Sequence, residues 1–138
     1  MTRQVFIDSG AWIAFLDRSD RLHREVVALF ARPPRRWCTS ALVIAETYGW
    51  FLHRLGEDAA RTFRLLIADL PKLAILGVDD RHRLAVDRRL EALRGTKLTY
   101  ADASSLVWLA DRRISIVWGT DHHLSIEGAA VVPGPPHH

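Results

Sequence analysis

Short apolar segments alternate with longer amphipathic segments along this chain. The short segments lie at residues 4–7, 37–39, 72–78, 114–118 and 129–132, which predicts strands. Apolar residues at helical spacing, capping residues and Pro or Gly stops predict helices between them, at residues 11–16, 21–31, 40–55, 57–70, 80–93 and 99–111. Three of these helices have a candidate cap at their start, which is Ser40 for the third, Asp79 or Asp80 for the fifth and Thr99 for the sixth. Apolar strands that alternate with helices favour a parallel sheet, so the predicted fold class is α/β.

The length of 138 residues suits one domain, which we place at residues 1–132, followed by a flexible tail at residues 133–138. Hydrophobic residues make up 49% of the chain, which excludes disorder, and no apolar run is long enough to span a membrane. A single cysteine, Cys38, excludes an intramolecular disulfide, and residues 1–8 lack the long apolar run of a secretion signal. We therefore expect a cytoplasmic protein.

The net charge of +3 makes the surface mildly attractive to polyanions. Acidic and basic residues are interleaved along the chain, so charge alone does not identify a nucleic-acid partner.

Three acidic residues occupy positions where a parallel sheet gathers a site. Asp8 follows the first predicted strand, and Asp121 follows the strand at residues 114–118. Asp102 falls in the first turn of the helix at residues 99–111. In open parallel sheets, ligands bind beyond the carboxyl ends of the strands, near a reversal of strand order.

Glu46 is the least expected acid, because its neighbours one helical turn away are Leu42, Val43 and Trp50. We therefore expect Glu46 to be buried among apolar neighbours, where a lone carboxylate should raise its pKa or bind a cation.

Each acid also has a plainer explanation when taken alone. Asp8 could cap the following helix, Asp102 could favour the dipole of its own first turn, and Asp121 could close a turn. Together, the four acids form an all-oxygen donor set that suits Mg²⁺ or Mn²⁺. Such ions activate water and offset charge on a phosphoryl group, so the implied reaction is phosphodiester hydrolysis.

The motifs around these acids resemble those of the PIN domains, and within them the VapC-type toxins of bacterial toxin–antitoxin pairs. The resemblance covers nearly the whole chain and rests on four segments, which are Val5-Phe6-Ile7-Asp8-Ser9-Gly10-Ala11-Trp12, Ala41-Leu42-Val43-Ile44-Ala45-Glu46, Leu98-Thr99-Tyr100-Ala101-Asp102-Ala103 and Val117-Trp118-Gly119-Thr120-Asp121-His122-His123-Leu124. Gly10 departs from the family pattern, which commonly has Ser or Thr there. His122 and His123 follow Asp121, whereas an aromatic or apolar residue is often found a little after this position in the family.

The resemblance implies a three-layer α/β/α fold and a Mg²⁺- or Mn²⁺-dependent endoribonuclease. Its acidic quartet would be Asp8, Glu46, Asp102 and Asp121, with Asp8 and Asp102 touching metal most directly and Glu46 and Asp121 acting through water or holding a second ion. Ser9 and Thr120 match the family's supporting hydroxyl positions. The resemblance also implies a homodimer and a cognate antitoxin that inserts a segment near the acids.

Other residues leave two interpretations open. Arg81, Arg88, Arg89 and Lys97 could contact an RNA backbone or form a solvated face. The five tryptophans could stack on bases, although their apolar neighbours favour packing in the core or at a dimer interface. His122 and His123 could assist a metal or protonate a leaving group, although metal-activated water needs no histidine.

Two competing functions remain. A phosphatase with an aspartyl nucleophile is disfavoured, because Gly10 stands where a phosphatase has its second Asp. A receiver domain is disfavoured as well, because it would have an acidic pair on the first strand and a late lysine, whereas the last lysine here is Lys97. The alternative to a nuclease is a catalytically inert PIN-like module that binds RNA or protein.

Overall fold

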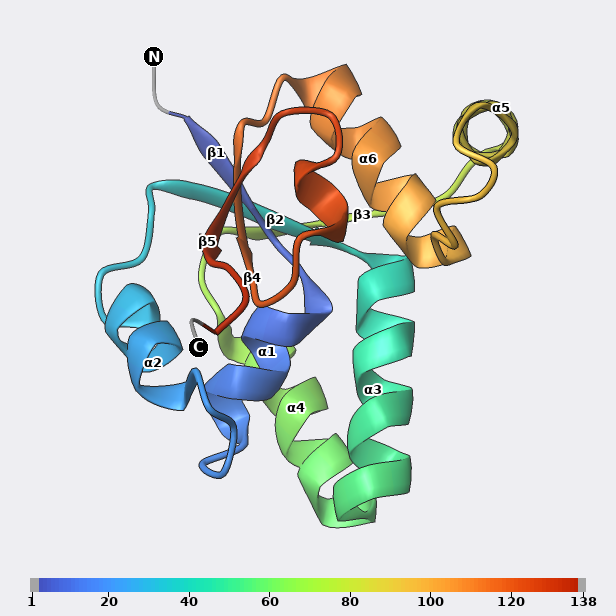
Figure 1. Cartoon of the computed structure of the whole chain (residues 1–138). Helices are drawn as coiled ribbons and strands as arrows, with labels where there is room; N and C mark the ends of the chain where they lie inside the picture. Colours follow the sequence, from blue (N-terminus) through green and yellow to red (C-terminus); the bar gives the residue numbers. More distant parts are fainter. Residues whose placement is uncertain (1–2, 137–138) are drawn as a thin grey trace.

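The computed structural model describes residues 3–136 and is built on a five-stranded parallel sheet in the order β3-β2-β1-β4-β5 (Figure 1). The strands are β1 (Gln4–Ile7), β2 (Arg36–Ser40), β3 (Leu73–Leu76), β4 (Ile116–Gly119) and β5 (Ala130–Pro133). β1 lies at the centre, so the chain builds outward to β3 on one side and then returns to add β4 and β5 on the other. The predicted α/β class with a parallel sheet is confirmed.

Helices connect the strands and pack largely in pairs. These helices are α1 (Ser9–Leu16), α2 (His23–Phe30), α3 (Ala41–Leu55), α4 (Glu57–Asp69), α5 (Asp80–Ala92) and α6 (Tyr100–Arg112), with a 3₁₀ turn η1 (His123–Ser125) before β5. α1 packs on α2, α3 on α4 and α5 on α6 (Figure 1). Right-handed crossovers place α1 to α4 on one face of the sheet and α5 and α6 on the other, because the chain crosses the sheet in opposite directions. This is the expected three-layer arrangement.

Side-chain caps fix where several helices begin. Ser40 Oγ accepts from the backbone N–H of Val43 at the start of α3, and Asp79 Oδ1 accepts from that of His82 at the start of α5. Ser40 is the predicted cap, and Asp79 is one of the two residues, Asp79 and Asp80, predicted to begin α5.

The local backbone explains why β3 and β4 begin later than predicted. Arg113 adopts a left-handed conformation after α6, and the backbone N–H of Ile114 donates to the Leu109 carbonyl at 2.9 Å. The backbone N–H of Ile114 therefore completes the end of α6 and is not free to pair in the sheet, so β4 starts at Ile116. Lys72 also has a positive φ of 62°, so β3 starts only at Leu73.

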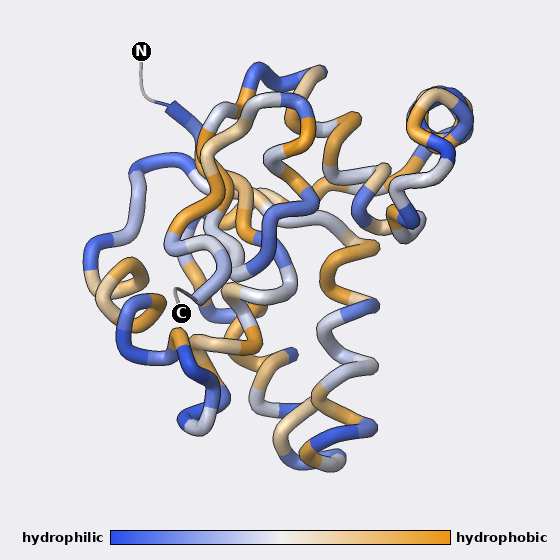
Figure 2. Tube along the Cα trace, in the orientation of Figure 1, coloured by the Kyte–Doolittle hydropathy of each residue, from blue (hydrophilic) through white to orange (hydrophobic). Residues whose placement is uncertain are grey.

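The core lies between the sheet and its helices. Figure 2 shows hydrophobic residues along the strands and mixed character along the helices. Phe30 makes ring contacts with Trp12, Phe15, Trp37 and Trp118 at centroid distances from 4.3 to 6.0 Å. Three of the five tryptophans are therefore packing residues.

The last strand extends beyond the predicted end of the domain. β5 runs to Pro133, one residue past the expected domain boundary, and the backbone N–H of Gly134 donates to the Gly119 carbonyl at 3.0 Å. Residues 137–138 of the expected tail lie outside the described residues. Among residues 3–136, every helix is too short or too polar to cross a membrane.

Candidate active site

Asp8 and Asp121 emerge from neighbouring strands at one edge of the sheet. Asp8 directly follows β1, and Asp121 lies just beyond β4. Ile7 pairs with Trp118 across these parallel strands, and the Asp8 backbone N–H donates to the Trp118 carbonyl at 2.9 Å. Both carboxylates therefore stand where the strand order reverses, which is the usual ligand position in such sheets.

Buried hydrogen bonds hold the end of β1 in front of Asp8. Thr39 Oγ1 donates to the Ile7 carbonyl at 2.8 Å and accepts from Trp12 Nε1 at 3.3 Å. Asp8 itself is only 6% exposed, and within the described part of the chain its side chain accepts no capping hydrogen bond from α1. A capping role therefore does not account for this buried carboxylate.

Burial raises the pKa of Asp8 from 3.8 to about 7. The backbone N–H of Ser9 acts in the opposite direction, whereas the charges of Asp121, Asp102 and Glu46 raise this pKa further. Four carboxylates from four separate segments thus share one electrostatic field.

Glu46 lies in α3 and is exposed, so the expectation that it is buried among apolar neighbours is wrong. α3 buries Val43, Thr47 and Phe51 and leaves Glu46 beside that face. Partial burial still raises the pKa of Glu46, a hydrogen bond from the Ser9 side chain lowers it, and Asp102 and Asp121 raise it. The Glu46 carboxylate therefore belongs to the same group of acids.

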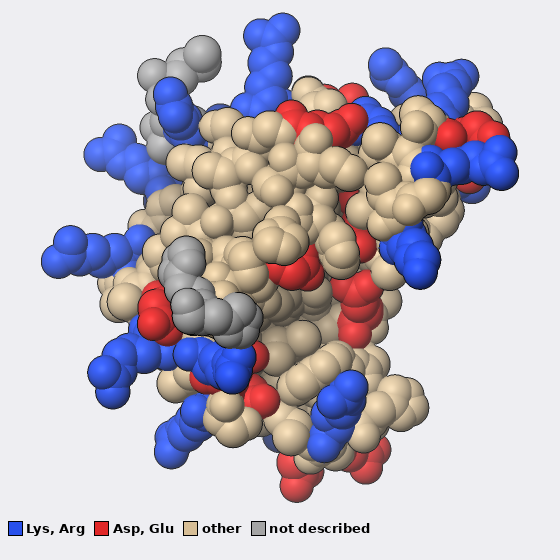
Figure 3. Space-filling model, viewed as in Figure 1, with Lys and Arg blue, Asp and Glu red and all other residues tan. Residues whose placement is uncertain are grey.

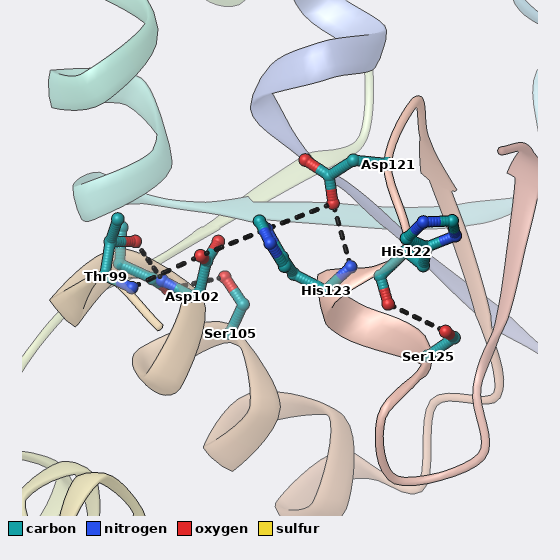
Figure 4. A network of polar contacts seen from close by, with 8 residues as sticks. Thr99, Asp102, Ser105, Asp121, His122, His123 and Ser125 are labelled. Atoms are coloured by element: carbon teal, nitrogen blue, oxygen red, sulfur yellow. Dashed lines mark hydrogen bonds and ion pairs between the residues drawn. The ribbon is translucent and has the colours of Figure 1, made fainter. Parts of the chain in front are cut away.

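Asp102 has a structural contact as well as a place among the acids. Thr99 Oγ1 accepts from the Asp102 backbone N–H at 3.0 Å, and Asp102 Oδ2 accepts from the Thr99 backbone N–H at 3.3 Å (Figure 4). This capping box begins α6. Asp102 therefore both begins α6 and belongs to the group of acids.

Asp121 closes a turn and contacts His123. Its Oδ1 accepts from the backbone N–H of His123 at 2.9 Å. The His123 imidazole then lies between two acids, with Nδ1 3.5 Å from Asp121 Oδ1 and 3.6 Å from Asp102 Oδ2 (Figure 4). The sequence indicated only that His123 is near Asp121. The contact with Asp102 could not be predicted. The turn closed by Asp121 has a local signal, because an Asp side chain often accepts from the backbone N–H two residues later.

The two supporting hydroxyls lie at the same edge. The Ser9 side chain lies near Glu46 and lowers the pKa of that carboxyl. Thr120 packs against Gly10, where an added Cβ would stand 2.0 Å from Thr120 Oγ1. The departure of Gly10 from the family pattern therefore coincides with a close approach of Thr120.

The four basic residues predicted to contact RNA have different surroundings. Arg81 and Arg88 line a cavity of about 540 Å³ between α5 and α6. Arg89 pairs with Glu127, and Lys97 is exposed in the turn between the two helices. The availability of these side chains to a ligand therefore differs.

The chemistry of the acids fits a hard divalent cation. Figure 3 shows Asp and Glu side chains gathered in the hollow at the centre of one face, with Lys and Arg side chains around its rim. Between residues 3 and 136, no three His, Cys, Asp or Glu side chains already stand close enough together to hold an ion. Binding would thus need side-chain movement or bridging waters, and Mg²⁺ commonly retains several waters.

A family model described as PIN domain matches residues 5–125. The chain belongs to the PIN domain family. A comparison with curated proteins gives no match.

Solved structures show the same fold. VapC20 of Mycobacterium tuberculosis, described as a sarcin-ricin loop cleaving toxin, is 21% identical, with a TM-score of 0.85 over 91% of this chain and 96% of that one. DNA-bound VapBC from Salmonella typhimurium is 16% identical, with a TM-score of 0.65 over 94% and 96% of the two chains. A toxin–antitoxin complex from Klebsiella pneumoniae is 21% identical, with a TM-score of 0.61 over 93% and 95%.

Proposed function

We propose that this chain is a divalent-metal-dependent endoribonuclease and the toxin of a VapBC-type toxin–antitoxin pair. The observation that carries the proposal is the convergence of Asp8, Glu46, Asp102 and Asp121 at the reversal point of a PIN-domain sheet. Structural likeness to VapC20, described as cleaving the sarcin-ricin loop, supports RNA as the substrate.

The four acids divide by burial. Asp8 and Asp102 are buried, 6% and 9% exposed, and would contact Mg²⁺ or Mn²⁺ directly. Glu46 and Asp121 are exposed and would hold the ion through water or hold a second ion. When bound, the metal lowers the pKa of water and offsets negative charge at the phosphorus.

Hydrolysis forms a bond from the water oxygen to phosphorus and breaks the bond from phosphorus to the 3′ oxygen. The leaving oxygen takes a proton, which gives a 3′-hydroxyl and a 5′-phosphate. Glu46 is exposed and has a raised pKa, so it is suited to accept the proton released by water.

The partners follow from the same assignment. Arg81, Arg88 and Lys97 would contact RNA phosphates, with a smaller contribution from Arg89 because it pairs with Glu127. The neighbours solved as VapBC and as a toxin–antitoxin complex support a cognate antitoxin. We also propose a homodimer, for which sedimentation should give twice the 15.7 kDa of one chain.

Cleavage of total RNA by purified wild type, Asp102→Asn and Asp111→Asn tests the proposal. The Asp111→Asn control makes the same charge change on the same helix, at an exposed residue beside the cavity between α5 and α6. We expect wild type and the control to cut RNA in Mg²⁺ or Mn²⁺ and not in EDTA. Asp102→Asn should lose at least about hundredfold in rate.

Equal cleavage by Asp102→Asn, or cleavage in EDTA, would contradict the proposal. Tight RNA binding by folded wild type, with no cutting of total RNA or of sarcin-ricin loop RNA in either metal, would favour an inert binding module instead.

A further inference from the structure

Four basic side chains line a pocket at the amino end of the sheet. The pocket has a volume of about 330 Å³, and none of its lining residues in the described chain is acidic. The basic residues come from three separate segments and are Arg35, Arg36, Lys72 and Arg112. In Figure 1, β1 and β2 start at the upper left and run toward α1 and α3, so the strands start at the opposite edge from the acids. This basic pocket is therefore separate from the candidate active site.

The strand register brings two of these cations together. Trp37 pairs with Leu73 across the parallel strands β2 and β3. The residues just before them, Arg36 and Lys72, therefore lie at the starts of neighbouring strands, which run about 4.8 Å apart. Trp37 Nε1 also donates to the Pro71 carbonyl at 3.0 Å, which ties the turn that carries Lys72 to β2. The backbone thus fixes where both side chains begin.

The four cations have no acidic partner within residues 3–136, because none of them forms an ion pair there. In contrast, Arg83, Arg89 and Arg94 each pair with an acid. Like charges that gather without a counter-charge repel one another and lower the stability of the fold. An anion from outside the chain would relieve this repulsion.

The buried thiol of Cys38 is influenced by two of these cations. Burial raises the pKa of Cys38 to about 12, whereas the positive charges of Arg112 and Arg36 lower it. One of these arginines ends α6 and the other begins β2, so their charges converge on the same part of the sheet.

Arg112 also connects the basic pocket with the cavity between α5 and α6. Its guanidinium lies over the Trp108 ring, 5.8 Å from the centroid, and Trp108 lines that cavity together with Arg81 and Arg88. Two lining residues of the cavity are acidic, so the basic pocket is the more positive of the two. Basic side chains therefore extend from α5 across the end of α6 to the amino edge of the sheet. A track of this length fits a chain of phosphates better than a single small anion.

We propose that the basic pocket binds phosphate groups of the RNA backbone, as a second contact for the substrate at the edge of the sheet remote from the acids. The inference rests on the proposed function, because RNA is the substrate of that site. Guanidinium groups donate paired hydrogen bonds that match phosphate oxygens, and three of the four cations are arginines.

The two sites together select RNA by its length. From Gln4 to Asp8, β1 extends about 13 Å at about 3.3 Å per residue. An RNA must therefore be several nucleotides long to reach the acids and the basic pocket at once.

Lysine acetylation reports on the basic pocket directly, because Lys72 and Lys97 are the two lysines of the chain. Mass spectrometry would measure the acetylation rate of each lysine in the full-length Asp102→Asn protein, with and without RNA. We expect bound RNA to slow acetylation of Lys72 by at least about threefold. Inorganic pyrophosphate and poly-glutamate at the same concentration of negative charge should slow it less than about twofold, because they lack the further contacts of RNA at the active site.

The salt dependence of RNA binding gives a second readout. Fluorescence anisotropy of labelled RNA would compare Arg36→Gln, Arg112→Gln and the control Arg61→Gln, each in the cleavage-blocked background. Arg61 is an exposed residue of α4 that does not line the basic pocket. Each pocket variant should bind RNA about three- to tenfold more weakly at low salt and reduce the slope of log affinity against log salt by about 0.7, the share of one phosphate contact. The control should keep both values.

Every other outcome overturns the inference. If RNA binds without protecting Lys72, or if the pocket variants match Arg61→Gln, RNA does not occupy the basic pocket and the nuclease proposal stands. Equal protection by pyrophosphate would assign the pocket to a free phosphoanion, and equal protection by poly-glutamate would assign it to an acidic protein segment. If wild type neither binds nor cuts RNA, the proposed function fails as well.

Discussion

Asp8 links the chemistry of the site to the stability of the fold, because a buried carboxyl with a raised pKa holds its proton more tightly when folded. Its pKa rises from 3.8 to about 7. Between these values the folded state binds more protons than the unfolded chain, so the free energy of unfolding falls as the pH rises. The stabilising contribution is full below about pH 4 and is lost as the pH rises through 7.

We therefore expect metal-free protein to lose up to about 4 kcal/mol from this residue between pH 4 and pH 8, taking about 1.4 kcal/mol per pKa unit. Urea unfolding in EDTA would measure the difference between wild type and Asp8→Asn, which cancels the titration of other groups. Asp8→Asn should be the more stable protein at pH 8. The exposed control Asp58→Asn should follow wild type, and a wild-type slope in Asp8→Asn would contradict the assignment.

Gly10 shows a constraint that only the packed structure reveals. A Cβ there would lie 2.0 Å from Thr120 Oγ1 and 3.1 Å from the Thr120 backbone nitrogen. Gly10→Ala should destabilise the protein by about 1 to 3 kcal/mol, because Thr120 must move. In a Thr120→Ala background the cost should shrink, because the Oγ1 atom that stands nearest to the added Cβ is gone. Alanine at position 10 then also favours the helix more than glycine does. A double-mutant cycle by urea unfolding measures this coupling, and additive effects would refute it.

Site residues were predictable from the sequence where a local rule places them and not where a tertiary contact does. Asp8 and Asp121 each follow a strand of a parallel sheet, so both were expected at the same edge of that sheet. The burial of Glu46 was predicted wrongly, because helical spacing identifies an apolar face without showing which part of it is covered. His123 meets Asp102 through a turn whose path the sequence does not specify.

At the scale of elements, caps and breakers were the informative signals. Ser40 and Thr99 begin helices as predicted, and Asp79 begins α5 where Asp79 or Asp80 was predicted, since each of these side chains accepts a backbone hydrogen bond from its own first turn. Strand boundaries were less predictable: apolar Ile114 completes the end of α6 and does not extend β4. An apolar run shows that residues are buried but not which neighbour takes their backbone groups.

The capping box of α6 separates two consequences of changing Asp102. Asparagine keeps an oxygen for the Thr99 N–H and removes a charge beside other carboxylates, so Asp102→Asn should be at least as stable as wild type. Asp102→Ala loses the cap contact, which should make it about 1 kcal/mol less stable than Asp102→Asn. Urea unfolding checks the order. Equal stability of the two variants would mean that the box contributes nothing.

For the whole molecule, the strand order decides where the acids meet. The order β3-β2-β1-β4-β5 places the reversal between β1 and β4, where Asp8 and Asp121 stand. A parallel sheet and its reversal were predictable from alternating elements, but the order itself was not, because the strand segments read alike and pairing is settled by packing.

The distribution of positive charge yields a prediction about RNA binding by the whole molecule. Each phosphate contact contributes about 0.7 to the slope of log affinity against log salt for single-stranded RNA. In an Asp102→Asn background, where cleavage is blocked, Arg88→Gln should weaken RNA binding and reduce that slope by close to one contact. Arg89→Gln should change it less, because the Arg89 guanidinium is engaged by Glu127 and is not free for phosphate. Fluorescence anisotropy of labelled RNA across a salt series would compare the two. A larger effect at Arg89 would mean that RNA displaces Glu127 from its ion pair with Arg89.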